Sequence, residues 1–372
     1  MSHDVVVVGA GYAGVSAVKA LEGTSADIDI TWISADANHE VKHEIHRIVR
    51  TPSLAEGLAI PVRSIAGRRT SFQEGRVTAI HPENRTVELA DGERVDFDYL
   101  LLTVGARTAF YGIPGLEDHS LLLERIEDAR AIHEHIRSQE SPRVVIGGAG
   151  LSGVQTAGEI KEYNPSASVT VVEALDTILP KVAPELQEAV AAELDNRSIE
   201  TQTGVPIVEA TDTSVILDGE TSLAYDVLIW TGGIAGRDVS HQETLAEERH
   251  RLSVDRTLQS SDERIFACGD AAVIAQPDGI APPSAQAAWQ AAPVAARNLL
   301  ATITGDPLTD WTYSDKGTLV SIGDAAFAHD IVGVPKATFG GIPAVTLKKL
   351  VAARWIKDAA SYRHALSLWR SL

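Results

Sequence analysis

Two stretches of the chain begin in the same way, with an apolar run, a glycine-rich turn and then apolar residues at helical spacing. Residues 5–8 are four valines, typical of a strand buried on both faces, and glycines follow at positions 9, 11 and 14. Residues 143–146 (RVVI) lead in the same way to glycines at 148, 150 and 153. Helical spacing then runs through Leu21 in the first stretch and Tyr163 in the second, which predicts two strand–turn–helix units.

The pattern that follows each unit is also repeated. A second strand is predicted at 28–34 and at 168–173, and short alternating segments then end in Asp-Gly turns at 91–92 and 218–219. Apolar strands at 99–105 and 225–233 close each repeat, and a helix is predicted from Pro184 to Leu194. The first half has no closing strand until residues 264–270, so the second domain is predicted to be inserted into the first.

The predicted fold class is α/β, with two Rossmann-like dinucleotide-binding domains that each combine a parallel sheet with an antiparallel meander in three layers. The breaks are expected near 112–115 and 233–238. We assign residues 1–111 and 236–310 to an FAD-binding domain, 112–235 to an NADH-binding domain and 311–372 to a C-terminal amphipathic helical region for membrane association or dimerisation.

The composition narrows the chemistry. A single cysteine, Cys268, excludes an internal disulfide and a redox-active cysteine pair, so electron transfer needs a bound cofactor. The formal net charge of −19 disfavours a nucleic-acid partner and favours a halophilic archaeal cytoplasm over an ordinary acidic one. No basic-then-apolar leader and no long apolar run are present, which predicts a cytoplasmic protein.

The two glycine turns predict two dinucleotides, because this spacing gives a tight turn, close approach of the backbone to a pyrophosphate and close helix packing. Glu173 follows Gly153 by 20 residues, where a carboxylate accepts hydrogen bonds from ribose hydroxyls and repels a 2′-phosphate, which favours NADH. In the first turn the same place is held by Ser34, and Asp36 comes two residues later. A hydride passed from NADH to FAD in the first domain explains both turns.

These features resemble the flavoprotein reductases of the pyridine nucleotide-disulfide reductase superfamily, and within it the type II (alternative) NADH:quinone oxidoreductases. The matching motifs are TVG at 103–105, WTGG at 230–233, GD at 269–270, IPVR at 60–63, FYGIPGLEDH at 110–119, LLERIEDARAIHEHI at 122–136, APPSAQAAWQ at 281–290 and YSDKGTLVSIG at 313–323. The resemblance implies FAD, NADH, a quinone acceptor of the menaquinone type and a homodimer. It also implies that Asp270, Lys316 and Val77 contact the flavin cofactor.

Gln286 and Gln290 lie four residues apart, so they share one helical face, where their amides could meet a quinone or the flavin edge. Two stretches depart from the family pattern. Gln155 stands where the family has a glutamate near the flavin, and an amide cannot carry a proton. Residues 41–47 (VKHEIHR) replace an aromatic and apolar stretch, and we expect the histidines around them to be solvated rather than to bind a metal.

The C-terminal tail differs in charge from the rest of the chain, with six basic residues and one acidic residue from Ala344 to Leu372. Apolar residues recur at three- and four-residue spacing, which predicts one helical stripe that lies on an anionic membrane surface or docks on protein. The stripe comprises Leu347, Val351, Trp355, Ala359, Tyr362, Leu366 and Trp369.

We therefore predict a peripheral FAD-dependent NADH:quinone oxidoreductase, without proton pumping, on the cytoplasmic face of the membrane. The alternatives are a soluble reductase of a small redox protein and a non-catalytic redox sensor. Predicted catalytic residues are Gln155, Gln286 and Gln290, and predicted cofactor contacts are Gly9, Ala10, Gly11, Tyr12, Ala13, Gly14, Asp36, Val77, Thr103, Gly105, Asp270, Lys316, Gly148, Gly150, Gly153, Glu173 and Gly232.

Overall fold

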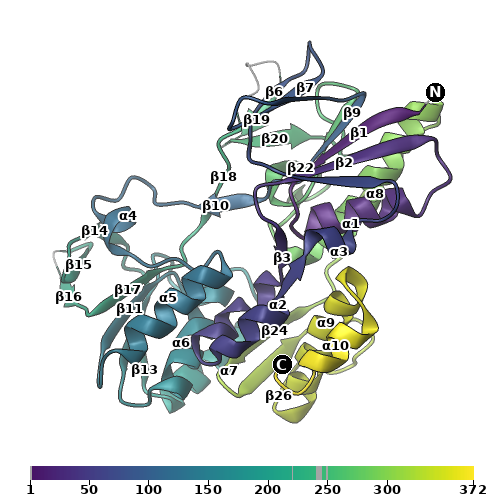
Figure 1. The fold of residues 1–372 in the computed structure, drawn as a ribbon. Coiled ribbons are helices and arrows are strands. Elements are labelled where there is room, and N and C mark those ends of the chain that lie inside the picture. Colours follow the sequence, from purple (N-terminus) through teal and green to yellow (C-terminus); the bar gives the residue numbers. More distant parts are fainter. Residues whose placement is uncertain (1, 220, 240–244, 249) are drawn as a thin grey trace. The chain divides into compact units, whose positions relative to one another are not determined.

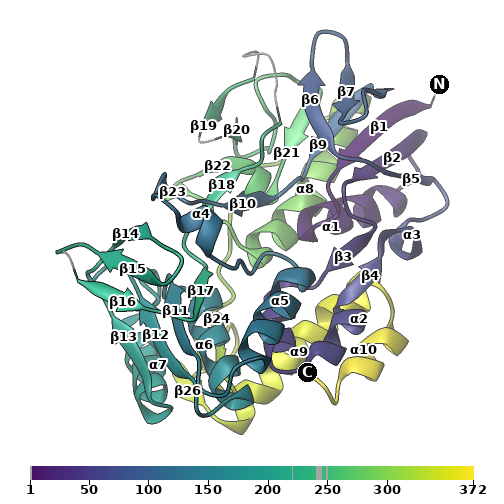
Figure 2. The same ribbon diagram turned by 60° about the vertical axis from the view of Figure 1, so that its left-hand side comes forward.

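The computed structural model describes residues 2–219, 221–239, 245–248 and 250–372 (Figures 1 and 2). These residues form two compact units. Unit 1 contains the chain up to His39 together with Ile60–Arg107 and Ile234–Asp315, and unit 2 contains Glu40–Ala59, Thr108–Gly233 and Lys316–Leu372. Unit 2 is therefore built from three separate pieces of chain. The assignment of one cofactor to each predicted domain stays a prediction.

Unit 1 is built on a five-stranded parallel sheet whose inner strands are largely buried, whereas the edge strand β5 is partly exposed. Its order is β21-β9-β1-β2-β5, which confirms that the late strand closes the first sheet, beside β9. The valines of β1 are buried, as the continuous apolar run predicts. The strands are β1 (His3–Val8), β2 (Ile28–Ser34), β5 (Thr70–Glu74), β9 (Tyr99–Leu102) and β21 (Ile265–Ala267).

Two helices of unit 1, α1 (Tyr12–Glu22) and α8 (Ala285–Thr304), lie side by side (Figures 1 and 2). The predicted meander is β6 (Val77–His81), β7 (Thr86–Leu89) and β8 (Arg94–Asp96), in which all pairs are antiparallel. The other elements of this unit are α3 (Val62–Ile65), β19 (Glu247–Glu248), β20 (Arg251–Val254), η3 (Gly269–Ala271), β22 (Ala272–Gln276) and β23 (Gly279–Ile280). Short strands at the unit boundaries are β3 (Asn38–Glu40), β4 (Ala59–Pro61), β10 (Ala106–Thr108) and β18 (Ile234–Gly236).

Unit 2 repeats the architecture with a four-stranded parallel sheet, in the order β13-β12-β11-β17. The strands are β11 (Arg143–Gly147), β12 (Ser168–Val172), β13 (Ile199–Gln202) and β17 (Val227–Trp230). The second meander is β14 (Ile207–Ala210), β15 (Ser214–Leu217) and β16 (Ser222–Ala224), again antiparallel. The helices are α4 (Leu116–His119), α5 (Ile126–Arg137), α6 (Leu151–Tyr163) and α7 (Pro184–Asn196). The two sheets confirm the predicted pair of Rossmann-like domains.

The segment at 40–59 and the C-terminal segment pack within unit 2. The first contains η1 (Lys42–Val49), η2 (Pro52–Leu54) and α2 (Ala55–Leu58), and η1 contacts α5 and α6. The second contains an antiparallel sheet and two helices: β24 (Thr318–Ile322), β25 (Ala325–His329), β26 (Thr338–Gly340), α9 (Ile342–Ala359) and α10 (Tyr362–Leu368). Helix α9 packs on this sheet and on α10.

The prediction of one continuous apolar stripe in the tail is wrong. The helix breaks at Ala360 and Ser361, and the Ser361 side chain accepts a hydrogen bond from the backbone N–H of His364 to start α10. Trp355 and Ala359 are buried inside unit 2, whereas Tyr362 and Leu366 are exposed. The stripe therefore divides between the interior of unit 2 and its surface.

The expectation of solvated histidines around residues 41–47 is also wrong. His39, Glu44 and His46 are all buried, although the segment is rich in charge. Burial is possible because polar partners come from elements far along the chain, which the local pattern does not reveal: the Ala10 carbonyl oxygen for His39, and Lys348 for Glu44 and His46.

Candidate dinucleotide sites

The glycine turn of unit 1 directly follows β1. Gly9 has a φ of +107°, a left-handed conformation that favours glycine. A Cβ atom on Gly14 would lie 1.9 Å from the carbonyl oxygen of Gly9, so glycine is required for α1 to pack against its own entry turn. These two glycines thus have structural roles that match the fingerprint.

The glycine turn of unit 2 reproduces this geometry. Gly148 has a φ of +100°, and a Cβ atom on Gly153 would lie 1.9 Å from the carbonyl oxygen of Gly148. The two turns of the chain are therefore structural copies.

The middle glycine of each turn is different, because it leaves a space in front of the helix. Gly11 and Gly150 are the N-caps of α1 and α6, and both have extended backbone. No described atom lies within 4 Å of a Cβ built on either one. A helix N-terminus with an open approach for backbone contact fits the pyrophosphate of a dinucleotide.

A threonine behind each turn holds it in place. The Thr103 hydroxyl lies 2.7 Å from the carbonyl oxygen of Val8 and 3.1 Å from that of Gly9. Thr231 lies at 3.1 and 3.0 Å from the corresponding oxygens of Gly147 and Gly148. The repeated Thr-x-Gly motif thus supports the turns from the neighbouring strand. Gly105 follows with a φ of +73°, at the carboxyl end of β9.

Asp270 lies at the same edge of the unit 1 sheet as its glycine turn. It sits in η3, directly after β21, and its carbonyl oxygen accepts a hydrogen bond of 2.9 Å from the Arg251 side chain. A Cβ atom on Gly269 would lie 3.1 Å from Cβ of Ala13 on α1. The structure therefore brings the Gly-Asp motif next to the first glycine turn. Val77 is buried at the start of β6, where it pairs with Leu89.

Sequence reasoning missed a histidine that supports the first turn. The buried His39 ring places Nδ1 2.8 Å from the carbonyl oxygen of Ala10, and because a carbonyl only accepts, Nδ1 carries the proton. The same ring lies edge-on to Tyr12, with centroids 5.4 Å apart. Nearby, the Ser34 hydroxyl accepts a hydrogen bond of 3.2 Å from the backbone N–H of Asp36. Whether Asp36 contacts a ribose stays a prediction.

Glu173 lies where a ribose carboxylate is expected, directly after β12. One carboxylate oxygen accepts a hydrogen bond of 2.8 Å from the N–H of Ala149, inside the glycine turn, and the other accepts one of 3.0 Å from Leu175. The structure thus joins this carboxylate to the second turn, and its contact with a ribose stays a prediction.

Gln286 and Gln290 share one face of α8, as predicted, and the two amides are hydrogen-bonded at 3.3 Å. The Gln290 amide also forms two hydrogen bonds with the backbone of Ser314: it donates to the carbonyl oxygen at 2.9 Å and accepts from the N–H at 3.2 Å. The Tyr313 hydroxyl donates to Gln286 at 3.3 Å. The pair therefore anchors residues 313–314 within unit 1, and its catalytic role stays a prediction.

Three other predicted residues lie in unit 2. Gln155 is buried on α6, where its carbonyl oxygen accepts from the N–H and the hydroxyl of Ser321, each at 3.3 Å. Lys316 is the first residue of the C-terminal part of this unit. A Cβ atom on Gly232 would lie 2.5 Å from the Trp230 ring, which gives this glycine a packing role.

The single cysteine is inert. Cys268 is fully buried at the end of β21, and burial raises the pKa of its thiol to about 12. A thiol that stays protonated is a poor nucleophile, so the structure offers no cysteine-based redox centre among the described residues.

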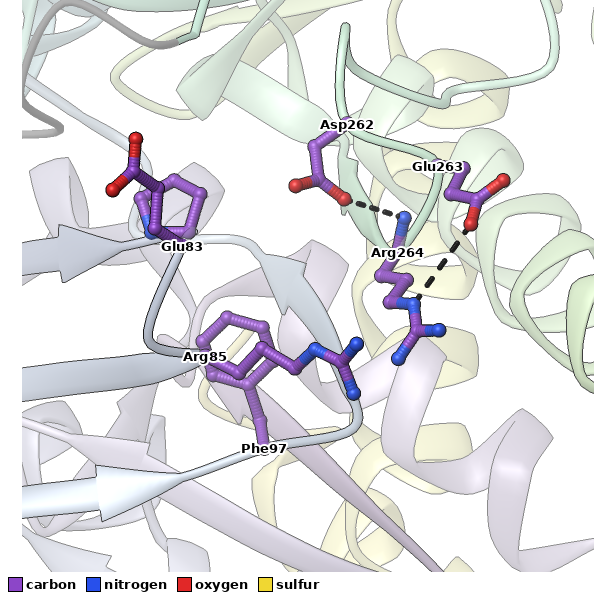
Figure 3. A pocket seen from close by; sticks show the side chains of 7 residues that line it. Glu83, Arg85, Phe97, Asp262, Glu263 and Arg264 are labelled. Atoms are coloured by element: carbon purple, nitrogen blue, oxygen red, sulfur yellow. Dashed lines mark hydrogen bonds and ion pairs between the residues drawn. The ribbon is translucent and has the colours of Figure 1, made fainter.

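A polar pocket in unit 1 is separate from the glycine turn (Figure 3). It is lined by Pro82, Glu83, Arg85, Phe97, Asp262, Glu263 and Arg264. Phe97 and Arg264 precede β9 and β21, and both strands run parallel to β1, so the pocket lies at the amino ends of the strands. The glycine turn lies at the carboxyl ends, where open α/β sheets bind ligands. Figure 3 shows Asp262 and Glu263 directed toward Arg264.

Two further searches concern metals and membranes. Across residues 2–219, 221–239, 245–248 and 250–372, no three His, Cys, Asp or Glu side chains are placed to hold a metal ion. Within those same ranges, no helix combines the length and apolarity needed to cross a bilayer.

Comparison with known proteins agrees with the presence of two glycine turns typical of dinucleotide sites. The chain is 29% identical over 384 residues to the type II NADH:quinone oxidoreductase of Staphylococcus saprophyticus, covering 94% of each protein, and 28% identical to that of Staphylococcus aureus MSSA476 at the same coverage.

Solved structures show the same fold. NDH2 of Plasmodium falciparum in complex with NADH matches with a TM-score of 0.86 at 17% identity, covering 100% of this chain and 98% of that one. The sulfide:quinone oxidoreductase of Aquifex aeolicus matches with a TM-score of 0.81 at 18% identity, covering 98% and 92%. The sequence pattern of the pyridine nucleotide-disulphide oxidoreductases matches residues 3–297. The chain therefore belongs to the pyridine nucleotide-disulphide oxidoreductase family.

Proposed function

We propose that this protein is a type II NADH:quinone oxidoreductase that uses FAD. The observation that carries the proposal is the pair of matching glycine turns, one on each parallel sheet. The chain also aligns over 94% of its length with relatives of that name. Two glycine turns imply two dinucleotides, and the different residues at corresponding places, Ser34 and Glu173, imply that the two dinucleotides differ.

Unit 1 is assigned to FAD and unit 2 to NADH. When bound, FAD accepts a hydride from NADH and passes two electrons to a quinone. The chain supplies binding and orientation: Gly11 and Gly150 present backbone N–H groups at helix N-termini, and Glu173 accepts hydrogen bonds from ribose hydroxyls. Asp270 is assigned to the flavin because it lies beside the first turn. No protein nucleophile is required.

Anaerobic stopped-flow absorbance tests this proposal. Excess NADH should bleach the flavin absorbance of the purified protein, and a soluble menaquinone analogue should restore it at a rate that matches steady-state turnover. A protein that binds no flavin contradicts the proposal. Bleaching without reoxidation by quinone would indicate the sensor alternative, and reoxidation only by a small redox protein would indicate the soluble reductase.

The C-terminal helices support peripheral binding to an anionic membrane, which we place on the cytoplasmic face. Exposed apolar side chains on α9 and α10 are interleaved with basic ones, a composition typical of helices at a bilayer interface. They are Ile342, Leu350, Val351, Tyr362 and Leu366 among Arg354, Lys357, Arg363 and Arg370. Changing Leu350, Tyr362 and Leu366 to serine should release the protein from anionic vesicles in a sedimentation assay.

A homodimer, a menaquinone acceptor and a halophilic source complete the proposal. The net charge of −19 supports the last, because salt screens the self-repulsion of an acidic surface. Activity should therefore rise between low and molar KCl. Light scattering at the salt concentration of highest activity measures the mass of the assembly.

A further inference from the structure

The polar pocket of Figure 3 is formed by three segments of unit 1, and the proposed function assigns no role to its residues. It has a volume of about 370 Å³, which is within the range of sites that bind small molecules. We call it the arginine pocket, and it is lined by Pro82, Glu83, Arg85, Phe97, Asp262, Glu263 and Arg264.

Backbone hydrogen bonds hold both arginines of the pocket beside the same stretch of chain. The Arg85 carbonyl oxygen accepts from the N–H of Phe97 at 2.9 Å, and the Arg264 carbonyl oxygen accepts from the N–H of Leu100 at 2.9 Å. Phe97 and Leu100 are buried, with exposed fractions of 4% and 0%. The two arginine side chains therefore extend from a backbone that is fixed to the core of unit 1.

The two guanidinium groups point toward each other across the arginine pocket (Figure 3). Among the residues that the structure describes, the Arg85 side chain forms no hydrogen bond or ion pair. Within the same residues, the only ion pair of Arg264 joins its Nε to a carboxylate oxygen of Glu263 at 3.9 Å, which is too long for a hydrogen bond. Both guanidiniums thus have N–H donors for a ligand, and two facing positive charges favour an anion between them.

The three carboxylates of the arginine pocket leave this space to a ligand. Asp262 accepts a hydrogen bond of 2.8 Å from the backbone N–H of Arg264, so it shapes its own loop. Figure 3 shows the Glu83 carboxylate directed away from both guanidiniums, and the Glu263 side chain is 78% exposed. Carboxylates only accept hydrogen bonds, so around a bound anion they favour an organic part that carries hydroxyl groups.

The backbone of Arg85 is in a conformation that arginine rarely adopts. Its φ is +55°, in the left-handed region, and its N–H donates to the carbonyl oxygen of Pro82 at 3.2 Å to close a turn. Asparagine fits such a position better, because its short side chain tolerates the left-handed region. An unfavourable residue in a fixed turn is typical of a side chain that is required for binding.

The chemistry of two guanidiniums distinguishes among anions. Each guanidinium offers paired N–H groups that match two oxygens of one anion. A carboxylate has two oxygens and one charge, so one guanidinium satisfies it. A phosphate monoester has three terminal oxygens and almost two negative charges at neutral pH, so it can accept from both. The volume of the arginine pocket leaves room for an organic group beside the phosphate.

We propose that the arginine pocket binds a phosphate monoester with a hydroxylated organic part, such as a sugar phosphate, and that its phosphate lies between Arg85 and Arg264. The site is separate from both glycine turns. The proposal therefore goes beyond the proposed function and does not depend on it.

Isothermal titration calorimetry of the purified, FAD-loaded protein tests the site without NADH or quinone. Ribose 5-phosphate, inorganic phosphate and ribose are the three probes, and KCl keeps the ionic strength constant because salt screens the attraction between guanidinium and anion. Ribose 5-phosphate should bind at one saturable site per chain, inorganic phosphate should bind more weakly, and ribose should not bind measurably.

Variants of opposite charge change should act in opposite directions. Arg85→Asn removes one guanidinium from the phosphate and should raise the Kd of ribose 5-phosphate by about 10- to 100-fold. Glu263→Gln removes the carboxylate beside Arg264 and should lower this Kd by about 2- to 5-fold. Arg68→Asn is the matched control, since Arg68 is an exposed arginine of unit 1 outside the arginine pocket, and it should leave the Kd unchanged.

Thermal unfolding separates loss of binding from loss of structure. Arg85→Asn should be at least as stable as the natural protein without ligand, because asparagine suits the left-handed turn. Ribose 5-phosphate should raise the melting temperature of the natural protein and of Arg68→Asn, because it binds the folded state, but it should have little effect on Arg85→Asn.

Gly150→Ala shows whether the second glycine turn binds the probe instead. This variant should keep the natural affinity for ribose 5-phosphate. Binding that is lost in Gly150→Ala but kept in Arg85→Asn would assign the phosphate to the glycine turn and overturn the proposal. A natural protein that does not bind ribose 5-phosphate, or that binds inorganic phosphate equally well, would also overturn it. None of these results depends on whether NADH reduces the flavin, so failure of the proposed function is measured separately.

Discussion

The two glycine turns have the same backbone but different surroundings. In both, the first glycine has a φ near +100°, and a Cβ atom on the third would lie 1.9 Å from the carbonyl oxygen of the first. At the end of the second strand, unit 1 has the neutral Ser34, and directly after it unit 2 has the carboxylate Glu173. In the proposed function, the shared backbone binds a dinucleotide in both units, and the residue at this place distinguishes the two dinucleotides.

A second difference concerns how the turns are supported. The carbonyl oxygen of Gly9 also accepts a hydrogen bond of 2.9 Å from the Trp32 indole, and the Ala10 carbonyl is held by His39. Thr231 matches Thr103, but the turn of unit 2 has Glu173 as its further support. If Glu173 binds the ribose as proposed, one carboxylate both supports the turn and contacts the ligand, which couples binding to the geometry of the turn.

The largest expected effect comes from filling the middle glycine of each turn. Gly11→Ala should give a folded but colourless protein, because the methyl group enters the open space at the N-terminus of α1. Gly150→Ala should keep the flavin and weaken NADH binding by about 100-fold or more, roughly 3 kcal/mol. The absorbance of the purified protein measures the flavin content, and titration with NADH measures the affinity for NADH. Gly23→Ala, whose Cβ would meet only ordinary contacts of 3.4 Å, is the control.

The next effect concerns pH and should belong to unit 2 alone. Glu159 on α6 corresponds to Ala20 on α1, counted from the third glycine of each turn. Burial raises the pKa of Glu159 to about 7, so the folded protein binds its proton more tightly than the unfolded chain does. This contribution to stability is full below about pH 4.5 and is lost as the pH rises through about 7.

The variant Glu159→Gln tests this pH-dependent contribution to stability. Between pH 5 and 8, the free energy of unfolding of the natural protein should fall relative to the variant by about 3 kcal/mol. Arg50, which loses Glu159 in the variant but keeps Asp324, adds an offset that does not change with pH. Chemical denaturation at several pH values measures the difference, and a constant difference across this range contradicts the assignment.

Replacing the ribose carboxylate should have a smaller effect. Glu173→Ser gives unit 2 the residue type of unit 1, and the loss of charge-assisted hydrogen bonds should raise the Kd of NADH by about 10- to 100-fold, roughly 1.5–3 kcal/mol. The Kd of NADPH should rise less, so the preference for NADH over NADPH should become smaller. Flavin content should not change. Glu188→Ser, at an exposed position on α7, serves as the control; an unchanged NADH affinity in Glu173→Ser means that the ribose binds elsewhere.

The smallest expected effect is on stability, and it compares the threonines that support the two glycine turns. Thr231→Val should lower the free energy of unfolding by about 1 kcal/mol, since the carbonyl oxygens of Gly147 and Gly148 lose its hydroxyl. Thr103→Val should lower the free energy of unfolding by less than this, because the Gly9 carbonyl oxygen keeps the Trp32 indole as a donor. Equal losses in the two variants would show that the indole does not compensate.

The sequence predicts the repeated elements well, because their signals are local. Strand β2 begins and ends at the predicted residues 28 and 34, and the closing strand β21 lies beside β9 as expected. A run of valines followed by glycines at fixed spacing determines strand, turn and helix almost without outside help. The helix face shared by Gln286 and Gln290 follows from local periodicity in the same way.

The ion pair between Glu44 and Lys348 could not be predicted, because the two residues are far apart in sequence. Lys348 belongs to the basic tail, and Glu44 to a charged segment whose histidines are expected to be solvated. Each is buried because the other neutralises it, across about 300 residues. The break at Ser361 is likewise decided by packing: Leu368 of α10 fills the space above Gly57, and His364 lies 2.7 Å from the Gly57 carbonyl oxygen. Periodicity alone cannot reveal such contacts.

The inert thiol at the end of β21 makes the protein ready for site-specific labelling. Because Cys268 is shielded from solvent and stays protonated, maleimide reagents should leave the natural chain unmodified. A cysteine introduced at an exposed position, such as Glu188, then becomes the one reactive thiol without prior removal of any other. Pairs of spin labels placed in this way, one in each unit, would measure how the two units move when NADH is added.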